Sequence, residues 1–561
     1  MGEQILSHAK KFNTVLSDYS KVSVESTGPY APDLEVESLI VGAGFAGVFA
    51  LKTLRDRGQK VVIYDAGNNL GGTWRWNCYP GARVDSPQPV YQYSWPEVWK
   101  TWNWSCKFPG YEEIQAYFDH VDKIFDIKKD CSFNTVVARA YFDTGLGRWI
   151  VKTYDGRTAK AKYLIMSTGY TSTRYIPPWS GMDRFKGVIH HSSFWPEEGV
   201  DVKGKRCAVI GTGASGVQII QEWGPIAGEI KAFQRTPNLA LPMRNDKFTT
   251  AEQDKAKALY PELFRYREKT FSGFLYDTIE RNTFDDTPEE RERYYEKLWA
   301  YGDFQIWLGQ YKDLLANENA NRETYNFWAK KTRARITDPR KRDLLAPLEM
   351  PHFFGIKRPC LQVSYYEQFN RPSVDVVDIR NNAIKEFDET GIVLEDGTHY
   401  EFDIIVVATG FDLATGVKWV GLESINGTKL KDEWENSVET YLGMTISGYP
   451  NMFSAYGMHS PLLLGNAPTV AEVQGRWIAD CIEKMERNGI KYINTKPEAA
   501  KAWKKRIVEL NNLTLLPTIR STYMGGMLLN EPNCYLGGVG NYVKEIRQAL
   551  DAWDGFESVM A

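Results

Sequence analysis

The sequence predicts an α/β protein in which two copies of one strand–loop–helix unit precede a helical insertion and further strands. Each copy has a short apolar strand, a G-x-G-x-x-G loop and a helix with one apolar face, and the copies start about 170 residues apart. The stretch from Thr250 to Leu345 is charged, poor in glycine and helical in period, and strand-like runs return at 374–379 and 403–408. Alternation of this kind predicts two Rossmann-like domains with a helical insertion.

The first unit has the pattern of a dinucleotide-binding fold. Residues 38–41 form the expected strand, 48–54 the helix and 61–64 the next strand, which ends at Asp65. The loop consists of Gly42, Ala43, Gly44, Phe45, Ala46 and Gly47. Glycines let the backbone turn tightly and approach a pyrophosphate, while the helix N-terminus provides oriented N–H groups. Asp65 follows Gly47 by 18 residues, a position from which a carboxylate accepts a hydrogen bond from a ribose hydroxyl.

The second unit differs at this acidic position. Its strand, 206–210, precedes a loop of Gly211, Thr212, Gly213, Ala214, Ser215 and Gly216. The next strand ends at Gln234, so Arg235 and Thr236 stand about where the ribose carboxylate would be. A guanidinium binds a 2′-phosphate bidentately, which predicts NADPH rather than NADH at this site. The alternative is that Arg235 is an ordinary surface arginine.

Composition narrows the class of protein. The 561 residues carry 68 Lys and Arg against 71 Asp and Glu, a net charge of −3, which argues against a nucleic-acid partner. No apolar signal core opens the chain and no run near 20 apolar residues occurs, so we expect a cytoplasmic protein without a membrane partner. The seven cysteines are dispersed without metal-ligand spacing, which is typical of a reducing compartment and predicts no metal site.

Two dinucleotide sites in one chain predict electron transfer between a tightly held flavin and an exchangeable nicotinamide. A flavin-dependent disulfide reductase would need a C-x-x-C or C-x-x-x-x-C pair, and the sequence has neither. Reduced flavin must therefore pass its electrons elsewhere, and O₂ is the obvious acceptor.

Four further blocks carry a resemblance to a known family. The fingerprint F-x-G-x-x-x-H-x-x-x-W-P occurs at 185–196 and G-G-x-W-x-x-x-x-Y-P-G-x-x-x-D at 71–85, followed by K-R-P at 357–359 and D-I-I-x-x-A-T-G-F at 403–411. With these blocks the chain resembles the type I Baeyer–Villiger monooxygenases from about Ile40 to Gly555. One region departs, because the family's S-W-x-x-G-A-N-x-P-G loop corresponds to 521–530, where Thr522 replaces Trp and Met527 replaces Asn.

The resemblance implies a reaction with FAD and NADPH as cofactors. NADPH reduces FAD, reduced FAD takes up O₂ as a C4a-peroxyflavin, and one oxygen atom enters next to a ketone carbonyl to give an ester or lactone. The implied partners are a small-molecule ketone and O₂, and we expect a monomer or weak oligomer. One alternative is a related flavin monooxygenase that oxygenates amines or sulfides, which Trp195, Pro196 and Arg358 disfavour. Another is a non-catalytic nucleotide-binding protein.

The resemblance also implies roles for single residues. Arg358 would stabilise negative charge on the peroxide and on the ketone adduct, because an arginine stays protonated. Asp85 would accept hydrogen bonds from Arg358 and orient it. Lys357 would join Arg235 at the 2′-phosphate, unless it is simply solvated. The residues expected to contact FAD in this region are Gly72, Thr73, Trp74, Tyr79, Asp85 and Arg358.

The linkers and the substrate pocket are less specific predictions. His191 lies between the two binding units, where the resemblance implies a structural or conformational role rather than general-base catalysis. Apolar residues at 457–468 and 524–529 are candidates for the substrate pocket and could equally be ordinary core.

The motifs divide the chain into interleaved segments, so that each nucleotide-binding domain is built from two separate stretches. We expect an N-terminal extension (1–35), a first FAD-binding segment (36–172), a first NADP-binding segment (173–245), the helical insertion (246–345), a second NADP-binding segment (346–380) and a second FAD-binding segment (381–561).

Overall fold

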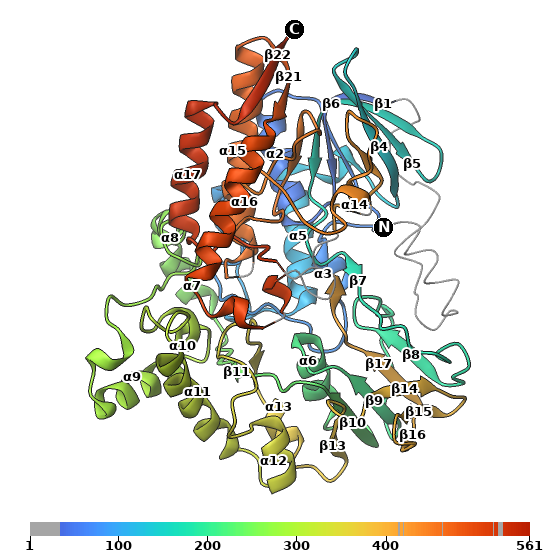
Figure 1. Ribbon diagram of the computed structural model, residues 1–561, viewed down its shortest axis with the longest axis vertical. Helices are drawn as coiled ribbons and strands as arrows, with labels where there is room; N and C mark the ends of the chain where they lie inside the picture. Colours follow the sequence, from blue (N-terminus) through green and yellow to red (C-terminus); the bar gives the residue numbers. More distant parts are fainter. Residues whose placement is uncertain (1–33, 413–415, 419, 463, 520, 525–530) are drawn as a thin grey trace.

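The computed structural model describes residues 34–412, 416–418, 420–462, 464–519, 521–524 and 531–561. All but the last two residues of the predicted N-terminal extension lie outside these ranges. Met527 and its neighbours also lie outside these ranges, so of the loop that differs from the family pattern the structure describes only 521–524. Figure 1 shows two sheets stacked along the long axis, with helices packed beside them.

The first glycine unit builds the centre of an eight-stranded sheet. Its strand order is β19-β4-β5-β6-β1-β2-β3, and β20 also pairs with β6. The strands are β1 (Leu34–Val41), β2 (Val61–Tyr64), β3 (Cys131–Ser132), β4 (Val137–Asp143), β5 (Arg148–Thr153), β6 (Thr158–Met166), β19 (Leu422–Glu423) and β20 (Met452–Ser454). Strands β6, β1, β2 and β3 are parallel, so the carboxyl ends of these four strands meet at one edge. All four residues of β2 are buried, as expected where both faces of a parallel sheet are covered.

The second glycine unit belongs to a separate parallel sheet of order β13-β10-β9-β17-β8. Its strands are β8 (Val188–His191), β9 (Arg206–Ile210), β10 (Glu229–Gln234), β13 (Val374–Asp378) and β17 (Ile404–Val407). Because β17 pairs with both β8 and β9, residues 404–407 belong with the second sheet. The predicted return to the FAD-binding domain at residue 381 is therefore too early. The buried strand β17 lies after that residue and is hydrogen-bonded to strands of the second sheet.

Small sheets complete the strand content of the described residues. They are the ribbon β14 (Ile384–Phe387), β15 (Gly391–Leu394) and β16 (His399–Glu401), and the pairs β11 (Leu241–Pro242) with β12 (Leu361–Gln362), β7 (Thr173–Arg174) with β18 (Phe411–Asp412), and β21 (Ile490–Thr495) with β22 (Phe556–Met560). The β7–β18 pair joins the two chain crossings between the large sheets, because β7 follows β6 and β18 follows β17. Both crossings are thus held side by side.

The predicted helical insertion is helical in the structure. Its helices are α7 (Thr250–Ala256), α8 (Tyr260–Arg267), α9 (Pro288–Ala300), α10 (Gln305–Leu308), α11 (Glu318–Arg333) and α12 (Pro339–Leu345). Helix α9 begins with a capping box, in which the Thr287 and Glu290 side chains each accept the other's backbone N–H. Helix α9 buries Tyr295 and Leu298, whereas Tyr301 follows its end and is exposed.

The remaining helices cover the first sheet or connect strands. They are α2 (Phe45–Asp56), α3 (Thr73–Trp76), α4 (Pro96–Trp99), α5 (Tyr111–Phe125), α6 (Ala214–Trp223), α13 (Tyr365–Gln368), α14 (Leu430–Glu433), α15 (Ala467–Arg487), α16 (Pro497–Asn512) and α17 (Val539–Ala552). Helices α15, α16 and α17, coloured orange to red in Figure 1, stand beside the first sheet. Helix α15 lies so close to α2 that a Cβ at Gly475 would be 2.5 Å from the Phe49 ring. Among the helices of the described residues, none has the length and apolar character needed to cross a membrane.

Candidate active site

The two glycine loops share one backbone geometry. Gly42 and Gly211, the first glycines, have φ of +111° and +104°, a conformation that favours glycine. Gly47 and Gly216, the third glycines, are packed so that a Cβ would lie 1.8 and 2.0 Å from the carbonyl oxygens of those first glycines. A Cβ at Gly213 would meet no atom within 4 Å. Open space therefore lies in front of the N-terminus of α6, where an anionic phosphate is favoured.

Asp65 follows β2 and is bonded to the backbone around the first loop. Its Oδ2 accepts from the Ala43 N–H and its Oδ1 from the Gly67 N–H, each at 2.6 Å. Burial raises the pKa of Asp65, and the two N–H groups oppose that rise. A carboxylate oxygen has the capacity to accept two hydrogen bonds, so Asp65 is suited to accept a further one from a hydroxyl in the cavity that it lines.

A cavity of about 470 Å³ extends from the first glycine loop to the second domain. The sequence-predicted residues in its wall are Gly42, Ala43, Gly44, Phe45, Ala46, Asp65, Gly72, Thr73, Trp74, Tyr79, Asp85, Ala214, Ser215 and Arg358. Gly47 is absent from the wall because it packs on Gly42. Most of the second loop also lies outside this cavity, and only its first two helical residues, Ala214 and Ser215, reach it.

Asp85 and Arg358 form a two-point ion pair at the cavity wall, although 273 residues separate them in the chain. The Arg358 Nε donates to Asp85 Oδ2 at 2.9 Å, and Nη2 donates to Oδ1 at 2.8 Å. Burial opposes the charge of Arg358, but the Asp85 carboxylate and these hydrogen bonds raise the pKa of Arg358 above its ordinary value. The guanidinium is therefore a fixed cation with a fixed orientation.

Arg235 and Lys357 form a pair of cations near the second glycine loop. Arg235 follows β10 and is exposed, whereas Lys357 is half-buried. Burial and the positive charge of Arg235 lower the pKa of Lys357, so the two side chains are close enough to repel each other. The Thr236 carbonyl accepts from Thr212 Oγ1 at 3.1 Å, which ties this turn to the loop. Two neighbouring cations of this kind suit a phosphate dianion.

Trp74 and Tyr79, expected at the flavin ring, differ in their polar contacts. Trp74 Nε1 donates to the Tyr91 hydroxyl at 3.0 Å within the first domain. The Tyr79 hydroxyl instead donates to Gln218 Oε1 on α6 at 2.8 Å, so Tyr79 bridges the two domains while its side chain lines the cavity. The Gln218 amide in turn donates to the Arg83 carbonyl at 3.2 Å.

His191, predicted in a linker, is the last residue of β8, and Trp195 lies in the segment that follows this strand. His191 is fully buried, its Nδ1 lies 2.8 Å from Ser193 Oγ, and its ring meets Phe411 edge-on with centroids 6.3 Å apart. Trp195 packs on Trp223 of α6 at a centroid distance of 5.5 Å. Neither His191 nor Trp195 is part of the cavity wall.

The wall also contains residues that the sequence did not single out, among them Tyr170, Arg174 and Tyr456. Tyr170 follows the carboxyl end of β6, an edge where ligands bind in α/β sheets, and this position could have signalled it. Tyr456 follows β20 in a left-handed conformation, with φ of +60°, and its ring lies 5.4 Å from that of Tyr170. No local sequence pattern marks that conformation.

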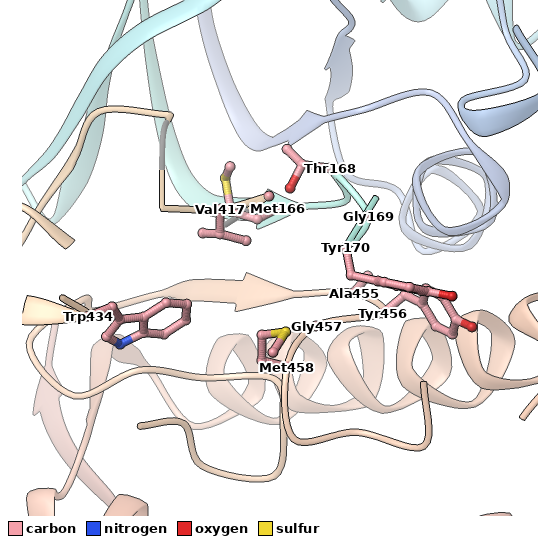
Figure 2. A pocket seen from close by; sticks show the side chains of 11 residues that line it. Met166, Thr168, Gly169, Tyr170, Val417, Trp434, Ala455, Tyr456, Gly457 and Met458 are labelled. Atoms are coloured by element: carbon pink, nitrogen blue, oxygen red, sulfur yellow. The ribbon is translucent and has the colours of Figure 1, made fainter. Parts of the chain in front are cut away.

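A second cavity of about 10 Å³ adjoins the large one (Figure 2). The two cavities share Thr168, Gly169, Tyr170, Ala455 and Tyr456 in their walls. Figure 2 shows the Tyr170 and Tyr456 rings side by side at one end and Trp434 at the other. Of the segments expected to form the substrate pocket, Gly457 and Met458 line this small cavity and Ala467 the large one, while 525–529 lie outside the described residues.

These residues fit two dinucleotides. The paired glycine loops, the open space at Gly213 and the acid at Asp65 suit pyrophosphate and ribose, and the cavity leads from the first loop to Arg358. When bound, NADPH supplies a hydride and FAD supplies the redox chemistry with O₂.

Comparison with known proteins places the chain among flavin monooxygenases. The family model "Pyridine nucleotide-disulphide oxidoreductase" matches residues 36–259. The FAD-binding monooxygenase acrE of Aspergillus aculeatus is 54% identical over 96% of this chain and 91% of its own. Cyclopentanone 1,2-monooxygenase of a Comamonas species is 41% identical (88% and 89%), and a Baeyer–Villiger monooxygenase of Pseudooceanicola batsensis is 34% identical (96% and 98%).

The chain belongs to the type I Baeyer–Villiger monooxygenases. Among solved structures, the OTEMO complex with FAD and NADP superposes with a TM-score of 0.89 at 32% identity, over 94% of this chain and all of that one. The predicted family, α/β fold class, cofactors FAD and NADPH, and enzyme class are confirmed. This Baeyer–Villiger monooxygenase therefore inserts one oxygen atom of O₂ next to a ketone carbonyl to give an ester or lactone.

Proposed function

We propose that this monooxygenase uses the Asp85–Arg358 pair to stabilise the negative charge that develops on the ketone oxygen. The observation that carries the proposal is the two-point contact at the cavity wall, with donor–acceptor distances of 2.9 and 2.8 Å. Charge-assisted bonds of this length fix both position and orientation of the guanidinium. A preorganised cation stabilises developing charge without reorganisation during the reaction.

The two nucleotides would occupy different regions of the site. FAD would lie along the cavity between the first glycine loop and Arg358, with its ribose at Asp65. NADPH would bind at the second loop, with its 2′-phosphate between Arg235 and Lys357. The mutual repulsion of these two cations supports this assignment, because a dianion between them removes the repulsion.

We propose an uncharged ketone as the substrate class. The charges of Arg358 and Asp85 neutralise each other. The guanidinium N–H groups therefore polarise a carbonyl, while the pair has no net charge that would attract an anionic substrate. Cyclic ketones are the first probes, since a relative of 41% identity is a cyclopentanone monooxygenase.

The seven cysteines, all of them among the described residues, form no disulfide with one another. We propose a monomer or weak oligomer that acts in the cytoplasm without a nucleic-acid partner.

A panel of ketones tests this assignment. Cyclopentanone, cyclohexanone and 2-pentanone are compared with 4-oxopentanoate, an anionic counterpart of the linear ketone. NADPH loss and ester formation are measured together. We expect at least one neutral ketone to give ester in proportion to NADPH, and the keto acid to give little. Hydrogen peroxide as the sole product with every ketone, or preference for the keto acid, would contradict the proposal.

A further inference from the structure

Two aromatic rings from the helical insertion lie against the Arg358 guanidinium. The guanidinium carbon is 4.9 Å from the centroid of the Phe304 ring and 5.9 Å from that of the Trp307 ring. Phe304 is fully buried, Trp307 is 1% exposed, and their rings meet edge-on with centroids 5.2 Å apart. Both distances are within the range at which a cation is attracted to an aromatic face.

The Trp307 indole also contacts the chain segment that carries Arg358. Gly355 lies three residues before Arg358 and has φ of +78°. A Cβ at Gly355 would lie 2.3 Å from Trp307 Nε1, so only a glycine lets the backbone pass this close to the indole. The insertion therefore constrains both the side chain and the backbone approach of Arg358.

Lys107 connects the aromatic rings of the insertion with the segment that carries the Asp85 carboxylate. Lys107 Nζ pairs with the Asp303 carboxylate at 2.9 Å, next to Phe304, and Asp303 is nearly buried. The Lys107 carbonyl accepts from the Gln88 N–H at 2.8 Å, in the segment that carries Asp85. The rings of the insertion and the Asp85 carboxylate are thus fixed relative to each other through Lys107.

We propose that Phe304 and Trp307 are positioning residues for Arg358, and that the helical insertion takes part in oxygen transfer through them. The inference rests on the proposed role of Arg358. The carboxylate fixes the edge of the guanidinium through hydrogen bonds, and the rings limit its remaining motion while burying it. Without the rings the positive charge stays in place, but the Arg358 guanidinium is free to turn. Ester formation therefore falls while flavin reduction by NADPH continues.

The test compares variants that remove or keep an aromatic face. Phe304→Leu is expected to lower the ester formed per NADPH consumed about tenfold, with hydrogen peroxide replacing ester. The anaerobic rate of flavin reduction by NADPH should stay within about twofold of the wild type. Trp307→Leu should lower the ratio as well, whereas Trp307→Phe keeps an aromatic face and should retain most of it. Trp307 Nε1 has no hydrogen-bond partner in the described part of the chain, so Phe orphans no acceptor there.

Phe327→Leu is the matched control, because Phe327 is a buried phenylalanine on α11 of the same insertion and contacts Tyr295 and Trp299 rather than Arg358. It should leave the ester ratio unchanged. An unchanged ratio in Phe304→Leu, or an equal loss in Trp307→Phe and Trp307→Leu, would overturn the positioning role. The Arg358→Ala variant separates the two proposals: undiminished ester formation there overturns the role of Arg358 itself, whereas its loss alongside an unaffected Phe304→Leu overturns only this inference.

Discussion

The hydroxyl of Tyr79 donates a 2.8 Å hydrogen bond to Gln218 Oε1, and this bond crosses from the first domain to helix α6 of the second. Both side chains are buried, at 8% and 6% exposure. The backbones also meet here, since a Cβ at Gly81 would lie 2.9 Å from the Gln218 carbonyl oxygen. The Y-P-G block therefore sets how the two nucleotide-binding units face each other.

Tyr79→Phe should weaken this contact between the domains. The variant leaves the buried Gln218 oxygen without its donor, which costs about 1–3 kcal/mol. We expect a lower melting temperature and a several-fold slower anaerobic reduction of the flavin by NADPH, with FAD retained. Tyr449→Phe, which removes a 3.0 Å bond to Glu433 within one domain, is the control. If both variants slow hydride transfer equally, the contact has no special role between the domains.

Asp85→Asn should reduce ester formation about 10²-fold. The amide NH₂ replaces one acceptor oxygen and faces a guanidinium N–H group, so one of the two hydrogen bonds is lost and Arg358 turns. NADPH consumption should fall much less, so the lost product appears as hydrogen peroxide. The comparison is with Glu423→Gln, which alters an equally bidentate pair with Arg139, at 2.8 and 2.7 Å, away from the cavity. Parallel loss of ester and NADPH turnover in Asp85→Asn would show a role in reduction instead.

Arg235→Ala should raise the KM for NADPH about 10–100-fold, the loss expected when a charged group no longer bonds a phosphate. The KM for NADH, which has no 2′-phosphate, should hardly change. Lys231→Ala alters a cation of β10, the strand that precedes Arg235, where Lys231 pairs with Glu229 at 2.8 Å, and serves as the control. Equal effects on NADPH and NADH would place Arg235 away from the 2′-phosphate.

The affinity for NADPH should fall as pH rises through the lowered pKa of Lys357. Burial and Arg235 push this pKa below the ordinary value of 10.5, so Lys357 loses its charge at a lower pH than a solvated lysine. Removing Arg235 removes one cause of the shift, and the alkaline limb of the KM profile should therefore move to higher pH in Arg235→Ala. A limb that stays in place would show that another group titrates. Lys357→Met should abolish the limb.

Gly213→Ala and Gly216→Ala should fail in different ways. A Cβ at Gly213 has open space, so the variant should fold with an unchanged melting temperature while NADPH binding falls, because the methyl group occupies the phosphate position. A Cβ at Gly216 would lie 2.0 Å from the Gly211 carbonyl oxygen, so that variant should lose stability. Unimpaired NADPH binding by Gly213→Ala would place the phosphate elsewhere.

Local patterns accounted for the elements of the fold whose geometry is local. The glycine loops, α2 and α6, and the strand that leads into Asp65 lie where the sequence predicted them. Each depends on backbone requirements within a few residues, which residue type and spacing express directly. The assignment of β17 failed because nothing within Ile404–Val407 states which sheet its partners belong to.

By itself, the sequence determined that this monooxygenase has two nucleotide-binding units, and it named Asp85, Arg235, Lys357 and Arg358 as residues of interest. The family resemblance also implied that Asp85 orients Arg358, a contact that the structure contains. Only the tertiary structure decided that Phe304 and Trp307 lie against the same guanidinium, and that Tyr79 bonds α6. The physical reason is separation along the chain. Contacts between residues tens to hundreds of positions apart depend on how whole sheets and the insertion pack, and no local propensity carries that information.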